Sequence, residues 1–180
     1  MVAIISLATG VARDMALGPY KGKGTGEPAL LRALLDGLAA HEIVLGDRYF
    51  GSFFMLEGLT RRDLDGLFRM YQGRKFDFRR GRRLGVEDHL VTWAKPPRPD
   101  WMDEKTYAQI PDEMTVRELR FKVEQPGFRV DNMVLVTTTL DATMYTKEEL
   151  ADLYLQRWSV EIFHLDHRSS VGLYVERLAA

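Results

Sequence analysis

Four polar side chains near the end of the chain have the types and the spacing that chemistry on a phosphate would need. Tyr154, Arg157, Glu161 and Arg168 follow one another at intervals of three, four and seven residues. On an α-helix these intervals bring all four side chains to roughly one face. That face would hold one carboxylate among phosphate-binding groups, as a metal-dependent enzyme acting on nucleic acid requires. An ordinary solvent-exposed helix face would have the same pattern.

A second carboxylate follows a short apolar run earlier in the chain. Residues 43–46 are typical of a buried strand, and Asp47 comes directly after them, where open α/β sheets place ligands and catalytic groups. Position alone leaves a turn-capping role for Asp47 equally open. Asp47 and Glu161 together can converge on a divalent metal, and their oxygen ligands suit Mg²⁺ or Mn²⁺. Such a site usually needs a third carboxylate, but the early candidate, Asp14, lies inside a strand, where we expect a surface role.

The third candidate feature is a basic segment, residues 69–83. Seven cations and one acid give it a local charge near +6, although the whole chain carries −1. Tyr and Phe alternate with the cations, which is the composition of a surface that follows a DNA backbone and stacks on bases. A solvated hairpin without a specific role is the alternative. The DNA-contact candidates in this segment are Arg74, Lys75, Arg79, Arg80, Arg82 and Arg83.

The composition excludes several classes of protein. With 180 residues, 28% charged and 46% apolar, the chain is long and apolar enough to fold around a real hydrophobic core. The absence of cysteine excludes disulfides and thiolate metal sites, and it favours a reducing, cytoplasmic setting. No apolar run approaches the roughly 20 residues that a bilayer-spanning helix needs, so we expect no membrane partner.

The elements that must position these residues follow an α/β rhythm. Residues 2–8 and 11–17 predict a β-hairpin, and the leucines of residues 27–38 recur with a helical period. Ser52 predicts the cap of a second helix that runs to about Leu59.

The middle of the chain breaks this rhythm. From about Leu67 to Val130, short strand-like pieces alternate with Gly, Pro and charged turns, which predicts an inserted, mostly β subdomain. Residues 133–138 then predict a buried strand, and a capping box of Thr146 and Glu149 starts the helix that carries the first motif. The predicted organisation is a first part of the core (1–66), the inserted subdomain (67–130) and the rest of the core (131–180).

Together these motifs resemble a known family. The pattern Tyr-x2-Arg-x3-Glu-x6-Arg at 154–168 is similar to the third-acid helix of bacterial insertion-sequence DDE transposases, specifically the insertion-sequence-four family. The glycine-rich residues 18–27, the strand end 46–50 and residues 78–81 resemble the same family. The similarity covers nearly the whole chain.

The resemblance implies a fold, a reaction and roles for particular residues. The implied fold is α/β: a ribonuclease-H-like mixed sheet with helices, interrupted by an inserted mostly β subdomain. The implied reaction is DNA cleavage and strand transfer with Mg²⁺ or Mn²⁺, in which Asp47 and Glu161 are the second and third catalytic, metal-binding acids. Tyr154, Arg157 and Arg168 would contact the phosphates of transposon ends, with Arg168 in place of the more usual lysine.

The chain also departs from the family pattern. The first catalytic aspartate of the family ends a strand upstream of the opening hairpin, and members continue past the last helix, so we expect a fragment truncated at both ends. The missing strand would lie between the hairpin and residues 43–46, and its absence would leave two ladders of backbone groups without partners. We therefore expect the isolated chain to be poorly stable and unable to cut DNA. Whether Met1 is the true start stays open.

Two functions from different classes follow. The first is a DDE transposase catalytic domain, inactive alone, whose partner is the DNA of transposon ends. The second is a non-catalytic DNA-binding or dimer-forming remnant that inhibits full-length transposase, with a homodimer or that transposase as its partner. An inert gene product is a third option. Removing the carboxylate of Glu161 distinguishes the first two, because it matters only to an enzyme.

Overall fold

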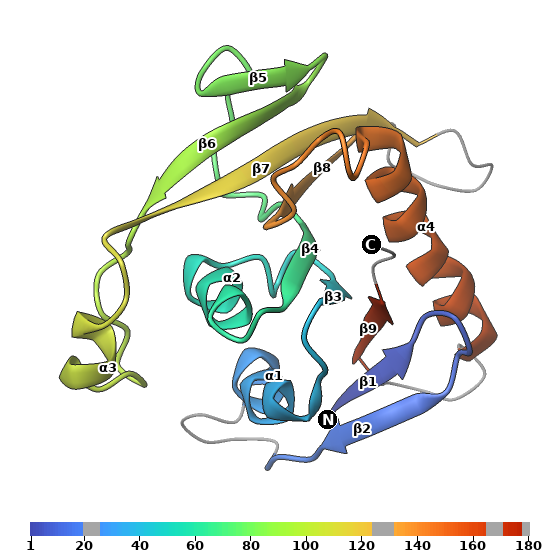
Figure 1. Cartoon of the computed structure of the whole chain (residues 1–180). Coiled ribbons are helices and arrows are strands. Elements are labelled where there is room, and N and C mark those ends of the chain that lie inside the picture. The colour runs from blue at the N-terminus through green and yellow to red at the C-terminus, as the bar shows by residue number, and fades with distance from the viewer. Residues whose placement is uncertain (20–25, 124–131, 165–170, 178–180) are drawn as a thin grey trace.

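A computed structural model describes residues 1–19, 26–123, 132–164 and 171–177, and it contains one large mixed sheet with helices on both faces (Figure 1). The strands lie in the order β2-β1-β9-β3-β4-β8-β7-β6-β5. Their bounds are β1 (Val2–Ser6), β2 (Ala12–Ala16), β3 (Glu42–Gly46), β4 (Asp65–Arg69), β5 (Arg82–Gly85), β6 (Asp88–Ala94), β7 (Glu113–Lys122), β8 (Asn132–Thr137) and β9 (Val171–Arg177). The helices are α1 (Glu27–Leu34), the 3-10 turn η1 (Leu35–Gly37), α2 (Phe53–Thr60), α3 (Glu104–Ala108) and α4 (Lys147–His164).

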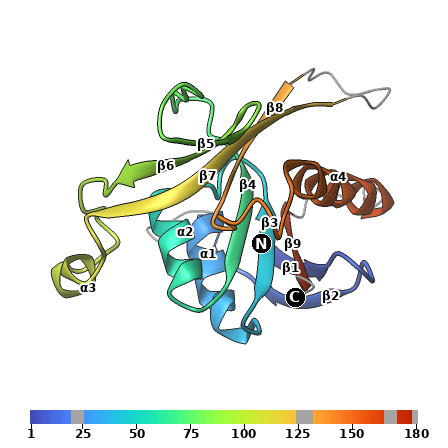
Figure 2. The same ribbon diagram turned by 45° about the horizontal axis from the view of Figure 1, so that its top comes forward.

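The helices divide between the two faces of the sheet. Figure 2 shows α1 and α2 on one side of the central strands and α4 on the other. Two apolar clusters fill these layers, and β3 contributes Val44 to one and Ile43 and Leu45 to the other. Because both faces are covered, the whole of β3 is buried, which explains its continuous rather than alternating apolar sequence. The predicted mixed α/β class is confirmed.

Local sequence signals placed several element boundaries correctly. The hydroxyl oxygen of Ser52 accepts a hydrogen bond from the backbone N–H of Met55 (3.3 Å) at the start of α2. At the start of α4, the backbone N–H of Thr146 donates to the Glu149 carboxylate (2.8 Å), and the Glu149 N–H donates to the Thr146 hydroxyl (3.2 Å). This reciprocal pair is the predicted capping box. Most of the glycine-rich turn predicted before α1, residues 20–25, lies outside the described residues.

The strand position between the hairpin and β3, which the sequence analysis expected to be empty, is occupied. β9 lies between β1 and β3, parallel to β1 and antiparallel to β3. The expectation of two unpartnered backbone ladders is therefore wrong, and with it the reason given for low stability. Leu173 and Val175 of β9 join the cluster beneath α1 and α2, whereas Tyr174 joins the cluster beneath α4.

The strands of the predicted inserted subdomain continue the same sheet. β7 pairs with β8 of the core on one side and with β6 on the other, and β5 completes the antiparallel set. β4, which crosses the predicted boundary at residue 66, pairs with both β3 and β8. The boundaries of the three predicted parts stay predictions.

Truncation of a β9 side chain tests the contribution of this strand to the core. Leu173 is fully buried, so we expect Leu173→Ala to lower the free energy of unfolding by about 2–5 kcal/mol. Chemical denaturation followed by circular dichroism measures the change. The matched control is Met144→Ala, at a side chain that is 57% exposed, with an expected change within about 0.5 kcal/mol. Equal effects of the two substitutions would contradict the central position of β9.

Candidate functional site

Asp47 lies at the carboxyl end of β3, next to the end of its parallel neighbour β4. Its Oδ1 accepts a hydrogen bond from the backbone N–H of Tyr49 (2.7 Å), so the turn-capping role is real and uses this oxygen. The residue before it, Gly46, is closely packed, because a Cβ there would come within 2.8 Å of the Leu173 side chain and would have to displace it. The close packing of β3 thus fixes where the Asp47 carboxylate emerges, partly exposed, at the sheet end.

Helix α4 is tied to the same place. The Tyr154 hydroxyl donates to the backbone carbonyl of Gly46 (3.1 Å), and this hydrogen bond is buried. One turn later, the guanidinium of Arg157 lies 5.2 Å from the centroid of the Tyr154 ring and 6.0 Å from that of Tyr174 on β9. The structure therefore brings Tyr154 and Arg157, two residues of the sequence motif, to the end of β3.

Two further arginines belong to this group, and the sequence analysis did not single them out. Arg69 ends β4, and the pKa of Arg69 is lowered first by burial and next by the charge of Arg48. Arg157 lowers it further, whereas Tyr154 and Asp47 oppose the shift. The sequence contains a signal for both Arg48 and Arg69, since Arg48 follows the strand-end aspartate and Arg69 ends the next parallel strand. Arginines gathered beside one carboxylate favour an anion such as phosphate.

The remaining motif residues are described less completely. Position 161 lies on α4, seven residues after Tyr154, so the helical period places it on the same face; the description of side chains in α4 extends to residue 157. Arg168 lies outside the described residues. Asp14 is exposed on β2, as expected. Among the side chains that the structure describes, no three His, Asp or Glu groups converge on one point.

A divalent metal fits part of this arrangement. The carboxylate oxygen of Asp47 is the kind of ligand that Mg²⁺ and Mn²⁺ prefer, and within the described chain its Oδ2 accepts no hydrogen bond. The neighbouring arginines repel a cation, so a metal here needs a second carboxylate or a phosphate to offset their charge. The resemblance noted in the sequence predicts Glu161 as that second carboxylate.

The basic loop, residues 70–81, connects β4 to β5 and carries the second candidate surface. Arg74 is half-buried with its guanidinium 3.5 Å from the centroid of the Trp93 ring, and burial lowers the pKa of Arg74. Lys75 is exposed. Hydrogen bonds from Arg79 lower the pKa of Asp77 to about 2, so this carboxylate is ionised at neutral pH and offsets part of the local positive charge.

Four arginines at the end of the basic loop and on β5 are exposed. The side chains of Arg79 and Arg80 are 90% and 84% exposed, although both lie near Asp77. Arg82 and Arg83 are exposed on β5, and Arg83 also donates to the Gly85 carbonyl (3.1 Å). Together with Lys75, five of the six DNA contacts predicted in this segment are thus on the surface, whereas Arg74 packs on a ring.

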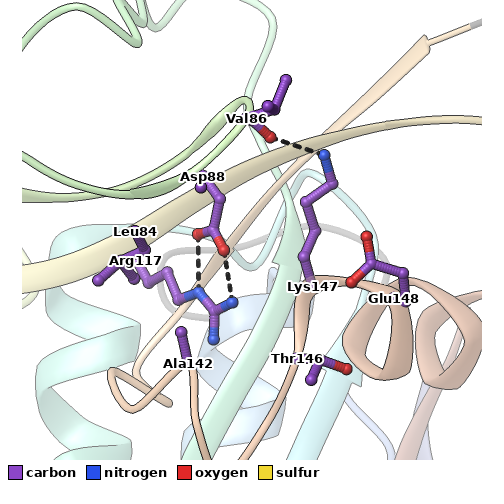
Figure 3. A pocket seen from close by; sticks show the side chains of 9 residues that line it. Leu84, Val86, Asp88, Arg117, Ala142, Thr146, Lys147 and Glu148 are labelled. Carbon is purple, nitrogen blue, oxygen red and sulfur yellow. Dashed lines mark hydrogen bonds and ion pairs between the residues drawn. The ribbon is translucent and has the colours of Figure 1, made fainter.

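A pocket of about 340 Å³ lies where the β5–β6 turn meets the start of α4 (Figure 3). Fully buried Arg117 pairs with Asp88 through two hydrogen bonds (2.8 and 2.6 Å) and also donates to the Tyr145 carbonyl. Lys147 donates to the Val86 carbonyl across the same gap (2.8 Å). Arg117 and Lys147 thus both have partners within the protein. The residues around the pocket are best explained as structural contacts that hold strands β5–β7 against α4.

The mixed sheet is covered by helices, and the aspartate at the end of β3 lies beside α4, which carries Tyr154 and Arg157. This arrangement is consistent with a ribonuclease-H-like domain. The family model for the transposase DDE domain matches residues 1–172, and the chain belongs to this family. Searches of curated proteins and of solved structures found no match. Proteins of this family act on DNA and generally use divalent metal ions.

The family match leaves the finer predictions open. Membership of the insertion-sequence-four family, a bacterial origin and truncation at both ends stay predictions, as do the roles of individual residues. In the part of the chain that is described, no helix has the length and apolar character needed to cross a membrane.

Removing the Tyr154 hydroxyl tests the link between α4 and β3. Tyr154→Phe leaves the buried Gly46 carbonyl without this donor, so we expect the free energy of unfolding to fall by about 0.5–1.5 kcal/mol. Tyr49→Phe is the matched control, because Tyr49 is 64% exposed, and we expect no measurable change. Urea denaturation of both variants gives the comparison. A Tyr154→Phe variant as stable as the control would show that the hydrogen bond does not fix the helix.

Proposed function

We propose that this chain carries two catalytic acids and the DNA-binding surface of a DDE transposase. Asp47 and Glu161 would hold a divalent cation, Mg²⁺ or Mn²⁺, and Tyr154, Arg157 and Arg168 would contact the phosphates of a transposon end. The observation that carries the proposal is the hydrogen bond from Tyr154 to Gly46, which joins the motif helix to the residue before Asp47.

The arginines around Asp47 support a phosphate at this site. Arg48 after β3 and Arg157 on α4 each interact electrostatically with Arg69 at the end of β4. Like charges held close together destabilise the free protein, and a phosphodiester between them relieves that repulsion. A bound divalent cation would supply polarisation of the attacking and leaving oxygens. The arginines would orient the phosphate, and Tyr154 would keep α4 in place.

We further propose that the isolated chain does not cleave DNA. Sites of this kind usually use three carboxylates, and the candidates here are Asp47 and Glu161. A second function, a non-catalytic DNA-binding or dimer-forming remnant that inhibits full-length transposase in the cytoplasm, is favoured by one observation. The exposed arginines of the basic loop and β5 belong to a different part of the sheet from Asp47, so DNA binding there does not require catalysis.

Metal binding tests the role of the two acids. We expect Asp47→Asn and Glu161→Gln each to weaken Mn²⁺ binding at least tenfold, about 1.4 kcal/mol, because each removes a charged oxygen ligand. Electron paramagnetic resonance of free Mn²⁺ measures the affinity. Asp14→Asn is the matched control, since it removes a carboxylate from the exposed face of β2.

Two results would contradict the proposal. Mn²⁺ affinity that is equal in all three variants would remove the acids from the metal site. Magnesium-dependent strand cleavage by the purified chain, abolished by Glu161→Ala, would overturn the proposed inactivity.

Charge reversal tests the DNA surface. We expect Arg80→Glu to weaken binding to duplex DNA and the Arg79→Glu, Arg80→Glu double variant to weaken it further. Loss of two phosphate contacts would reduce the slope of log affinity against log salt by about 2. Fluorescence anisotropy over a salt series measures both quantities. The single-charge control is Lys105→Glu on α3, an exposed cation outside the basic segment, and a slope unchanged by reversal at Arg79 and Arg80 would rule out these contacts.

A further inference from the structure

The basic loop rests on a buried polar group that the proposed chemistry does not use. We call His89 and Trp93 of β6 and Glu118 of β7 the anchor cluster. Their exposed fractions are 1%, 3% and 3%, so all three side chains are removed from water. A buried carboxylate and a buried imidazole need partners, because burying either without a hydrogen bond is costly. The partners connect the sheet to the loop.

A chain of hydrogen bonds runs from β7 to the loop backbone. Glu118 Oε1 accepts from Trp93 Nε1 (2.8 Å), and Glu118 Oε2 lies 3.1 Å from His89 Nε2. His89 Nδ1 lies 2.7 Å from the backbone carbonyl oxygen of Arg80. A carbonyl oxygen can only accept, so Nδ1 carries a hydrogen and donates it to Arg80. Glu118 is therefore joined through His89 to the residue that carries an exposed guanidinium.

Ring contacts hold the rest of the loop. The Phe78 ring lies 4.7 Å from the His89 ring, centroid to centroid, and the Arg74 guanidinium covers Trp93 at 3.5 Å. The charge of Glu118 raises the pKa of Arg74 against the larger effect of burial, as expected for a cation held near this carboxylate. Arg74 and Phe78 thus cover the anchor cluster, whereas Arg79 and Arg80 project into solvent.

The exit from the loop is also fixed. Gly81 has a φ of +74°, and a Cβ at this position would come within 2.0 Å of the Leu90 carbonyl oxygen on β6. The backbone here approaches β6 as closely as glycine permits. The basic loop is therefore a preformed surface, attached at its middle by rings and at its end by His89 and Gly81.

We propose that Glu118 is a positioning residue for DNA binding. Through His89 and Trp93 it holds the basic loop in the conformation that presents Arg79 and Arg80 together. A surface ordered in advance binds more tightly than one that DNA has to order. This inference rests on the proposed DNA-binding function, although its effect on the loop can be measured without DNA.

The sign of the effect separates positioning from simple electrostatics. Glu118→Ala does not make the chain more negative, so charge alone predicts no loss of DNA affinity. Positioning predicts weaker binding, and we expect a loss of at least fivefold by fluorescence anisotropy with a duplex oligonucleotide. Glu118→Gln also removes the carboxylate but keeps the contacts, because its carbonyl accepts from Trp93 Nε1 and its amide donates to Nε2 of the His89 tautomer that carries its hydrogen on Nδ1. We expect its affinity to equal or exceed that of the unmodified chain.

Glu113→Ala is the matched charge control. Glu113 is exposed on the same strand, β7, and its replacement also removes one carboxylate without touching the anchor cluster. We expect its affinity to be no weaker than that of the unmodified chain. Because Glu118→Ala could lower stability, thermal unfolding of all variants is followed by circular dichroism, and the Glu118→Gln and Glu113→Ala results hold whether or not Glu118→Ala stays folded.

Limited trypsin digestion measures directly whether the basic loop keeps its conformation. Release of the loop exposes cleavage sites after Arg74, Lys75, Arg79 and Arg80. We expect cleavage at these sites to be at least fivefold faster in Glu118→Ala than in the unmodified chain, and unchanged in Glu118→Gln. Cleavage after Lys105, on exposed α3, should be the same in all variants and reports general unfolding if it is not.

The results distinguish failure of the inference from failure of the proposed function. Slow loop cleavage and unweakened DNA binding in a folded Glu118→Ala variant would overturn the positioning role alone. Weakened binding in Glu118→Gln as well would also overturn it, because the contacts are kept there. If the unmodified chain binds no DNA, the proposed function fails and the inference fails with it, whatever the loop cleavage shows.

Discussion

The hydrogen bond from the Tyr154 hydroxyl to the Gly46 carbonyl is the constraint on which the candidate site depends. Gly46 is closely packed, because β3 is buried on both faces and a Cβ at this position would meet the side chains of Leu173, Phe50 and Phe68. A donor from α4 that reaches this carbonyl therefore fixes the helix relative to the sheet. The capping box at Thr146 sets where the helix begins, so one local and one long-range contact together determine the position of each later residue of α4.

The two positively charged regions are stabilised in different ways. Around Asp47, burial lowers the pKa of Arg69, the charges of Arg48 and Arg157 lower it further, and Tyr154 and Asp47 oppose the shift. In the basic loop, the inward-facing cation, Arg74, covers the Trp93 ring of β6 and the outward-facing Arg79 and Arg80 share Asp77, so these cations have partners within the protein. The first region is suited to a phosphate that enters a site, and the second to a backbone that passes over a surface.

The sequence predicted the features that depend on near neighbours. The Ser52 cap, the capping box and the strand before Asp47 each follow from residues a few positions apart, and the structure contains all of them. Features that depend on distant partners were missed or wrong. Nothing local marks residues 171–177 as a central strand, and Arg69 joins the site only because β4 pairs in parallel with β3. Likewise, the basic composition of residues 69–83 does not reveal that Arg74 packs on Trp93.

The side chains of β9 determine its register between β1 and β3. β1 and β3 run in opposite senses, so β9 is parallel to one and antiparallel to the other. Backbone hydrogen bonds form on both sides of β9, and the alternation of its side chains determines which residues face each layer of helices. Leu173 and Val175 face the α1 and α2 layer, which leaves Tyr174 on the α4 side, where its ring lies beside Arg157. A register shift by one residue would exchange these faces and remove the ring from the guanidinium. The environment of Arg157 is thus set by β9 as well as by its own helix.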